Sequence, residues 1–433
     1  MDDAEGQAGL SGLLDAVEDA SPVEAVEAVT RRIGLALGAT EVSFLVADLS
    51  GRGLVRLKHI PLKDSAPAGV TLEPADANGH GERRDARELA TNLPFDGGPA
   101  ERALRTQAVQ VLPPLGLDGD LPRLWTVLAP VTERGEPLGL LELLLPDEPA
   151  PAVLEEIART AHLLGFVTIA SRRHTDLYEW GQRSTPFSLS AEVQRRLLPA
   201  AYTCEGGSFT LSAWLEPAED VGGDTFDYSL ARDVLHLSVT DAMGHGVASS
   251  LTATLCVGSL RNSRRHGAPL LEQAEQANAA LLEHAESLAA ESFSTGLLGR
   301  LDLGTGELEL INAGHVAPYL LRGGRLEVMD LPPDFPLGLF ADATYRITRL
   351  ALQPGDRLVL VTDGMLERNA ADLDLPGLVA QTSDQHPREA TRHLADLVLE
   401  ATGHALADDA TLLMLDWHGN HGDGRDTTSG RPA

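Results

Sequence analysis

The sequence is poor in cysteine, in basic residues and in long apolar runs, and each shortage argues against a class of protein. Cys204 and Cys256 are the only two cysteines among 433 residues. Their spacing predicts neither a metal-binding motif nor a disulfide-rich secreted domain. Lysine and arginine number 34 against 64 acidic residues, which gives a formal net charge of −30. Binding to nucleic acid or to an anionic membrane needs clustered positive charge, so neither is expected.

Long hydrophobic segments are also missing. No apolar run approaches the ~18 residues that are needed to cross a bilayer. The N-terminal segment MDDAEGQAGL is acidic and lacks the apolar centre of a signal peptide. We therefore expect a cytoplasmic protein. Hydrophobic residues make up 43% of the sequence, which is ordinary for folded domains, and the length allows two or three of them.

The N-terminal part of the chain predicts a small α+β domain between residues 21 and 172. A helix is followed by a strand pair, a loop-rich stretch with a short helix from about 63 to 100, a second strand pair and a closing helix at 151–172. This order, and above all the stretch LAPVTERGEPLGLLELLL at 128–145, resembles a GAF domain, a common sensory module. The resemblance implies a small ligand, which the sequence does not identify. The alternative is an unrelated α+β domain of the same size.

Three further segments lie outside the two predicted domains. Residues 1–20 are predicted to be a disordered N-terminus, 173–200 a helical linker, and 418–433 a disordered tail. The linker is explained equally well as a lever that passes conformational change and as a plain spacer. The second domain is predicted at 201–417, where apolar and polar residues alternate in several strand-like runs. Leu358–Val361 is apolar throughout, as expected of a strand that is covered on both faces.

Four short segments that carry aspartate are spread over this second domain. Three of them adjoin runs that predict β-strands, and the ends of neighbouring strands lie about 5 Å apart. The carboxylates can therefore converge on one place. Several carboxylates share a site at neutral pH only when positive charge lies between them, and a divalent metal ion is the simplest source of that charge. The segments are VGGD (221–224), TDAMGHG (240–246), VTDG (361–364) and ADDAT (407–411).

Seven segments of residues 188–417 are similar, in the same order, to those of the metal-dependent protein phosphatase (PPM) family. The branch is the one typified by bacterial stage II sporulation protein E. Each string alone is a weak signal, whereas seven in register are a strong one. The resemblance implies two packed antiparallel β-sheets flanked by helices, and a serine/threonine phosphatase. The segments are AEVQRRLLP (191–199), PAEDVGGDTFDY (217–228), TDAMGHG (240–246), NAGH (312–315), PLG (336–338), VTDG (361–364) and DDATLL (408–413).

The same resemblance assigns metal-binding roles to individual residues. Asp241 would bridge two Mn²⁺ or Mg²⁺ ions, with the backbone carbonyl of Ala242 as a further ligand. Asp224 would hold one ion, directly or through water, and Asp363 and Asp408 would bind the other. These ions favour oxygen ligands and retain several waters, and two of them about 4 Å apart activate a bridging water. No serine, cysteine or histidine nucleophile is required, so direct hydrolysis without a phosphoenzyme is predicted.

Several neighbouring residues have a second interpretation. His245 is either a general acid or a structural histidine at the start of a helix, and the second interpretation is favoured. His315 is interpreted as structural, aiding a turn at a strand end. Asp409 adjoins a predicted ligand, but the register favours Asp408. Thr225 stands where the family usually has an aromatic residue, and the phosphate-binding arginine of eukaryotic relatives has no obvious counterpart.

The sequence as a whole predicts a signalling enzyme in which a GAF-like sensor precedes a PPM-type phosphatase domain. The branch of the family implies a phosphorylated anti-sigma-factor antagonist as the substrate. The alternatives are a non-catalytic regulator that binds a ligand or partner on the same fold, and a metallohydrolase that acts on small phosphate esters. The sequence leaves open the choice between Mn²⁺ and Mg²⁺, the oligomeric state (a homodimer included) and autoinhibition of the resting enzyme.

Overall fold

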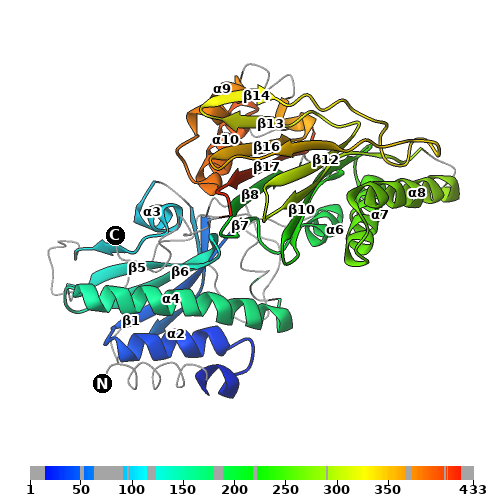
Figure 1. Ribbon diagram of the computed structural model, residues 1–433. Coiled ribbons are helices and arrows are strands. Elements are labelled where there is room, and N and C mark those ends of the chain that lie inside the picture. Colours follow the sequence, from blue (N-terminus) through cyan, green and yellow to red (C-terminus); the bar gives the residue numbers. More distant parts are fainter. Residues whose placement is uncertain are drawn as a thin grey trace. The chain divides into compact units, whose positions relative to one another are not determined.

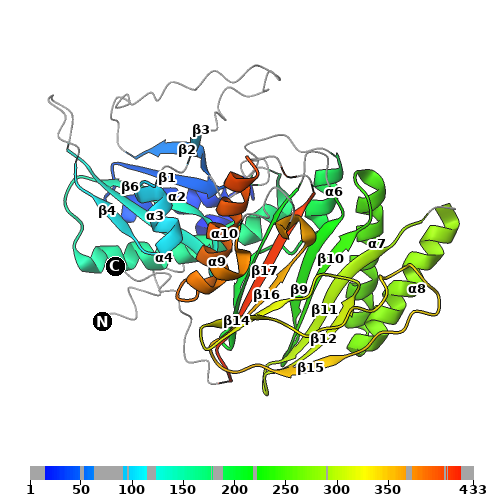
Figure 2. The same ribbon diagram turned by 90° about the horizontal axis from the view of Figure 1, so that it is seen from above.

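The chain divides after Pro186 into two compact units, and each is described by itself (Figures 1 and 2). None of the helices in the described ranges combines the length and the hydrophobicity that crossing a bilayer requires. The computed structural model describes residues 15–48, 53–62, 91–94, 97–114, 123–176, 178, 189–217, 222–288, 291–366, 373–403, 406 and 408–420.

The N-terminal unit is an antiparallel sheet with helices packed on both faces. Its elements are α2 (Ala25–Ala36), β1 (Glu41–Ala47), β2 (Gly53–Pro61), β3 (Thr91–Pro94), α3 (Pro99–Thr106), β4 (Gln110–Leu112), β5 (Trp125–Glu133), β6 (Glu136–Leu145), α4 (Pro151–Ser171) and the 3-10 helix η1 (Arg172–His174). The strands lie in the order β3-β2-β1-β6-β5-β4. Helices α2 and α4 cover one face and α3 the other, as Figure 1 shows.

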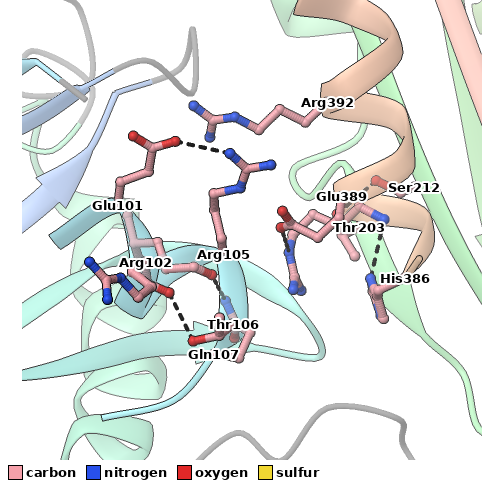
Figure 3. Close-up of polar contacts among 12 residues, drawn as sticks. Glu101, Arg102, Arg105, Thr106, Gln107, Thr203, Ser212, His386, Glu389 and Arg392 are labelled. Atoms are coloured by element: carbon pink, nitrogen blue, oxygen red, sulfur yellow. Dashed lines mark hydrogen bonds and ion pairs between the residues drawn. The ribbon is translucent and has the colours of Figure 1, made fainter. Parts of the chain in front are cut away.

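Strand β1 shows why this sheet needs cover on both faces. Phe44 and Val46 pack with α2 and α4, while Leu45 and Ala47 pack with Leu104 of α3. Both sets of side chains are apolar, so neither face of the strand is suited to contact with water. Helix α3 carries some of the polar contacts drawn in Figure 3, among them an ion pair between Arg105 and Glu101 one turn apart, with Nη1 and Oε1 3.1 Å from each other.

Three expectations for this part of the chain are corrected by the structure. Residues 15–19 are helical, although they belong to the predicted disordered N-terminus, of which 1–14 lie outside the described residues. Strand β3 lies in the stretch predicted as loop. It is an edge strand that ends in Pro94, and edge strands tolerate proline because only one side of the strand must pair. The linker is not one continuous helix, since η1 ends at an extended Thr175 before helical structure is described again at Tyr178 and from Leu189 onward.

The C-terminal unit is a sandwich of two antiparallel sheets flanked by helices, which confirms the predicted fold class. One sheet has the order β15-β12-β11-β10-β9 and the other β14-β13-β16-β17-β8-β7. The elements are α6 (Leu189–Leu197), β7 (Thr203–Glu205), β8 (Phe209–Glu216), β9 (Asp224–Leu230), β10 (Val234–Ala242), α7 (Val247–Arg265), α8 (Leu270–Leu288), β11 (Ser294–Asp302), β12 (Glu307–Ala313), β13 (Tyr319–Arg322), β14 (Arg325–Val328), β15 (Thr348–Ala351), β16 (Asp356–Val361), η2 (Asp363–Leu366), α9 (Leu375–Gln381), α10 (Pro387–Ala401) and β17 (Ala410–Trp417).

The core between the two sheets is made by alternate residues of their strands. Phe226 and Leu237 of the first sheet pack against Phe209 and Leu360 of the second. Helices α7 and α8 cover the outer face of the first sheet, and α9 and α10 cover that of the second (Figure 2). Strand β16 is buried on both faces, which explains the uninterrupted apolar run at Leu358–Val361.

The chain remains ordered for a short distance beyond the last strand. His418 donates its backbone N–H to Ser208 O at 2.8 Å, and its Nε2 lies 2.8 Å from Thr210 Oγ1. These contacts attach residues 418–420, predicted as part of the disordered tail, to the edge of β8. The rest of the predicted tail lies outside the described residues.

Candidate metal centre

At one end of the sandwich, polar side chains occupy inner-face positions where the core pattern would place apolar ones. Leu237 and Val239 of β10 point into the core, and the next inner-face residue along that strand is Asp241. On β9, Phe226 belongs to the core and Asp224 is the inner-face residue before it. Asp224 and Asp241 are direct cross-strand partners, and such side chains lie on one face about 5 Å apart. Strand periodicity therefore places two carboxylates together.

The opposite sheet supplies two hydroxyl groups to Asp224. Thr362 directly follows β16, and Thr411 is the second residue of β17. Their Oγ1 atoms donate to Oδ2 of Asp224 at 2.7 Å and 2.6 Å. Asp224 is 2% exposed, and its carboxylate thus joins the two sheets. The sequence interpretation missed both threonines, although they stand beside predicted ligands in the strings VTDG and DDAT.

The two adjacent aspartates before β17 have different environments. Asp409 is buried, and its Oδ1 accepts a hydrogen bond from Gly222 N at 3.1 Å. Its Oδ2 accepts from Asp224 N at 3.4 Å and from Gln194 Nε2 at 2.9 Å. Asp408 is exposed, and its Oδ1 accepts from Asp409 N at 2.9 Å. Asp409 therefore fastens the GGD segment to β17, while Asp408 faces the solvent side, where a ligand can be reached.

Three glycines allow the close approach of these segments. A Cβ on Gly222 would lie 2.2 Å from the Asp409 carboxyl group, and one on Gly364 would lie 2.0 Å from the Asp409 carbonyl oxygen. A Cβ on Gly223 would lie 2.1 Å from the carbonyl oxygen of Ala242, whose N–H donates to Gly223 O at 3.2 Å. Any side chain at these positions would push the aspartate segments apart, because backbone and carboxyl atoms occupy the space.

Burial and neighbouring carboxylates raise the pKa of Asp224 and of Asp241. Burial, followed by the charges of Asp363, Asp408 and Asp409, raises the pKa of Asp241 to about 7. Burial, followed by the charges of Asp241 and Asp409, raises the pKa of Asp224 well above its ordinary value, against the lowering effect of the two threonine hydroxyls. The four predicted ligands therefore lie in one electrostatic cluster, although they come from positions far apart in the chain.

A divalent cation fits this set of donors. Negative charge accumulates here, and positive charge between carboxylates is what restores their ionised forms. In the described part of the chain, no three His, Cys, Asp or Glu side chains are grouped closely enough to hold a metal ion by themselves. Mg²⁺ and Mn²⁺ do not need such a group, because they bind a few carboxylates and retain several waters. The Ala242 carbonyl, beside Gly223, adds a further oxygen of the kind these ions prefer.

His315 has the structural role predicted for it. Its Nδ1 lies 2.8 Å from Thr295 Oγ1 and its Nε2 lies 3.1 Å from Val361 O, so the imidazole connects β11 of one sheet with β16 of the other. Burial lowers the pKa of His315 to about 4, and the neutral ring can accept from the hydroxyl and donate to the carbonyl. Thr295 is the β11 partner of Asp241, so this bridge fixes the sandwich next to the carboxylates.

His245 lies on the surface, between two glycines with positive φ, Gly244 at 88° and Gly246 at 78°. The role favoured from the sequence, a structural histidine at the start of a helix, would be supported if the His245 side chain made a capping hydrogen bond to α7. The N-cap of α7 is instead Gly246, and no side chain makes the capping hydrogen bond. Thr225, on the outer face of β9, is paired with Thr240 by a contact of 2.6 Å between the two Oγ1 atoms, which replaces the aromatic side chain usual in the family.

Alanine substitutions at the adjacent residues Asp408 and Asp409 should reduce stability by unequal amounts. Asp409→Ala leaves three N–H groups without their carboxylate, and we expect the free energy of unfolding of the metal-free protein to fall by about 3 kcal/mol. Asp408→Ala removes one partly buried hydrogen bond, and a loss of about 1 kcal/mol or less is expected. Urea unfolding of the two variants at neutral pH measures both values, and equal losses would contradict the division of roles.

Residues 231–418 match the family described as Stage II sporulation protein E (SpoIIE), and this range contains Asp241, Asp363 and Asp408. The chain is similar to phosphoserine phosphatase RsbU of Bacillus subtilis, with 22% identity over 236 residues that cover 52% of this chain and 68% of RsbU. It is also similar to phosphoserine phosphatase RsbP of the same organism, with 21% identity over 215 residues that cover 48% of this chain and 52% of RsbP.

Among solved structures, the chain is similar to the RsbU and RsbW domains of a protein from Mycobacterium tuberculosis. The identity is 26%, the TM-score is 0.43, and the match covers 48% of this chain and 60% of that one. Each of these matches thus covers about half of this chain, and the matched part spans 52% to 68% of the relatives' own lengths.

Proposed function

We propose that this chain hydrolyses phosphoserine or phosphothreonine in a signalling protein of bacteria, in keeping with the match of residues 231–418 to the SpoIIE family and the similarity to a phosphoserine phosphatase. The observation that carries the proposal is the electrostatic cluster of Asp224, Asp241, Asp363 and Asp408 at one end of the sandwich. Such a cluster of carboxylates in one place is costly to the fold unless it serves to hold cations.

The residues of the cluster have distinct places in the proposed metal site. From the family resemblance, we assign Asp241, with the carbonyl of Ala242, as the residue that would bind both of two Mn²⁺ or Mg²⁺ ions, and the charges of Asp363 and Asp408 do act on its pKa. Asp224, whose Oδ2 accepts from two threonines, would hold one ion directly or through water. Asp363 and Asp408 hold the other. When bound, such ions polarise a phosphoryl oxygen and lower the pKa of water between them.

The protein itself contributes position and charge. Asp224 is fixed by hydroxyl groups of the opposite sheet, so its orientation is set before any substrate arrives. Asp363 and Asp408 are exposed, which leaves the solvent side open to a phosphorylated side chain. Phosphoryl transfer to water then requires alignment and charge neutralisation, with little covalent chemistry from the protein.

Cysteine is a poor candidate for an alternative nucleophile. Cys204 and Cys256 are both buried. Burial raises the pKa of Cys256 to about 12, so its thiol stays protonated at neutral pH, and the thiolate is the nucleophilic form. This supports direct hydrolysis without a phosphoenzyme.

The substrate and the regulation follow from the family and from the arrangement of the chain. We assign a phosphorylated anti-sigma-factor antagonist as the substrate, in keeping with the similarity to two phosphoserine phosphatases. We assign the N-terminal unit as a GAF-like sensor that binds a small ligand and controls the phosphatase. Its separate core supports an independent binding function. Helix α6 supports the control, because it follows the junction of the units and reaches Asp409 through Gln194.

Hydrolysis of a phosphoserine protein by the full chain tests the proposal. We expect phosphate release with Mn²⁺, none with a chelator, and recovery when Mn²⁺ is restored. The kcat/KM for the phosphoprotein should exceed that for p-nitrophenyl phosphate by about tenfold or more, because the remote parts of a protein substrate add binding energy. A preference for the small ester would favour a metallohydrolase of small phosphates. Mn²⁺ binding without hydrolysis of either substrate would favour a non-catalytic regulator.

A further inference from the structure

The segment AEVQRRLLP of α6 contains a glutamine to which the proposed chemistry gives no role. Gln194 is 3% exposed, and a buried amide requires hydrogen-bond partners. Both of its N–H groups have one, since Nε2 lies 2.8 Å from the carbonyl oxygen of Asp224 and 2.9 Å from Oδ2 of Asp409. These two acceptors belong to different sheets of the sandwich. One amide group of α6 therefore connects the sheets at the carboxylate cluster.

The contacts of Gln194 set the distance between two parts of the site. The two N–H bonds of an amide diverge at a fixed angle. Two acceptors that are both bonded to the same amide therefore cannot move independently. One acceptor is the main chain of Asp224, a proposed metal ligand, and the other is the carboxylate that fastens Gly222 to β17. Residues that orient metal ligands in this way typically change metal affinity or activity by about 10–100-fold when they are replaced.

Helix α6 is itself fixed to the same end of the sandwich. Leu197 packs with Ala242 and Ala253, and its carbonyl accepts from Arg261 Nη2 of α7 at 2.5 Å. Arg261 also forms an ion pair with Asp227 of β9. Helix α6 lies beside α7 in both ribbon views (Figures 1 and 2). The glutamine is thus presented from a packed helix, which makes its amide a firm support for the residues it contacts.

We propose that Gln194 is a positioning residue for the metal centre, and that it sets cation affinity by holding the Asp224 backbone and the Asp409 carboxylate together. This inference rests on the proposed function, which identifies the carboxylate cluster as a metal site. Gln194 does not contact the cation or the phosphoryl group in this scheme. Its effect is transmitted through the two aspartates that it holds.

Mn²⁺ binding by the full chain, measured by calorimetry and independently of turnover, tests the proposal. We expect Gln194→Met, which keeps the length of the side chain and removes both donors, to weaken Mn²⁺ binding by about 10–100-fold. Gln273→Met is the matched control. Gln273 is also 3% exposed, and its Nε2 donates to Ala268 O at 2.8 Å, but it lies in α8 and its acceptor belongs to the segment just before its own helix. The control should lose similar stability and bind Mn²⁺ as the wild type does.

The route through Asp409 is tested by a double-mutant cycle. In an Asp409→Ala background, Gln194→Met should weaken Mn²⁺ binding by less than about threefold, because the link between the Asp224 backbone and the Asp409 carboxylate is already broken. If Gln194→Met does not fold, Gln194→Asn, which is one methylene too short to reach both acceptors, replaces it. Undiminished Mn²⁺ affinity in the glutamine variant, or full additivity in the cycle, would overturn the role of Gln194 while leaving the metal site intact. Absence of Mn²⁺ binding to the wild type would instead overturn the proposed function.

Discussion

Replacing Asp241 with asparagine should remove nearly all phosphatase activity and leave the fold intact. Asparagine keeps the shape of the side chain but not the charge that is proposed to contact both ions. Cation-assisted hydrolysis draws several kcal/mol of transition-state stabilisation from those ions, so we expect kcat to fall by about a thousandfold or more. Phosphate release from a phosphoserine protein at saturating Mn²⁺ measures the effect.

A matched control lies next to the start of the same strand. Asp233 is exposed and stands just before β10, at the end away from Asp241. Asp233→Asn should therefore retain wild-type turnover. Substantial activity in Asp241→Asn, with the control unchanged, would show that the carboxylate cluster is not the reaction centre. Circular dichroism of both variants would establish that the comparison is between folded proteins.

The stability of the metal-free protein should decrease as pH rises through the range in which Asp241 ionises. The pKa of Asp241 is raised from 3.8 to about 7, so the folded state keeps a proton that the unfolded chain has released. This contribution to stability is complete below about pH 4 and is lost as pH rises through about 7. Three pKa units correspond to about 4 kcal/mol as an upper limit, and the interaction with Asp224 spreads the loss over a wider range.

Mn²⁺ should reverse this dependence, because a cation between the carboxylates favours their ionised forms. Urea unfolding of wild type and Asp241→Asn between about pH 5 and pH 8 separates this group from others that titrate in the same range. Without metal, Asp241→Asn should become increasingly more stable than the wild type as pH rises. Mn²⁺ should stabilise the wild type more at higher pH. A difference that does not change with pH would contradict the raised pKa.

Much of the C-terminal fold follows from local patterns in the sequence. The alternation at Leu235, Leu237 and Val239 predicts a strand with one face in the core, and the structure has it as β10. The apolar run at Leu358–Val361 predicts a strand covered on both faces, which β16 confirms. These predictions succeed because a period of two residues fixes which side chains share a face, whatever the neighbouring strands are. Strand β3 was missed because an edge strand tolerates proline.

The aspartate strings also indicated the chemistry of the site. Strand ends that carry carboxylates, separated by more than a hundred residues between Asp241 and Asp363, predicted a place where negative charge collects. In the folded protein, the charges of Asp363 and Asp408 raise the pKa of Asp241. Their individual assignment as metal ligands remains a proposal, which the variants above test.

The sequence by itself determined which residue types are present and which strand face each of them occupies. Only the tertiary structure decided which side chains meet across the two sheets. It buried Asp409 and left Asp408 exposed, and it brought Gln194 of α6 to both Asp224 and Asp409. The physical reason is that strand periodicity is a local property of the backbone, whereas contacts between sheets depend on how segments some two hundred residues apart pack together.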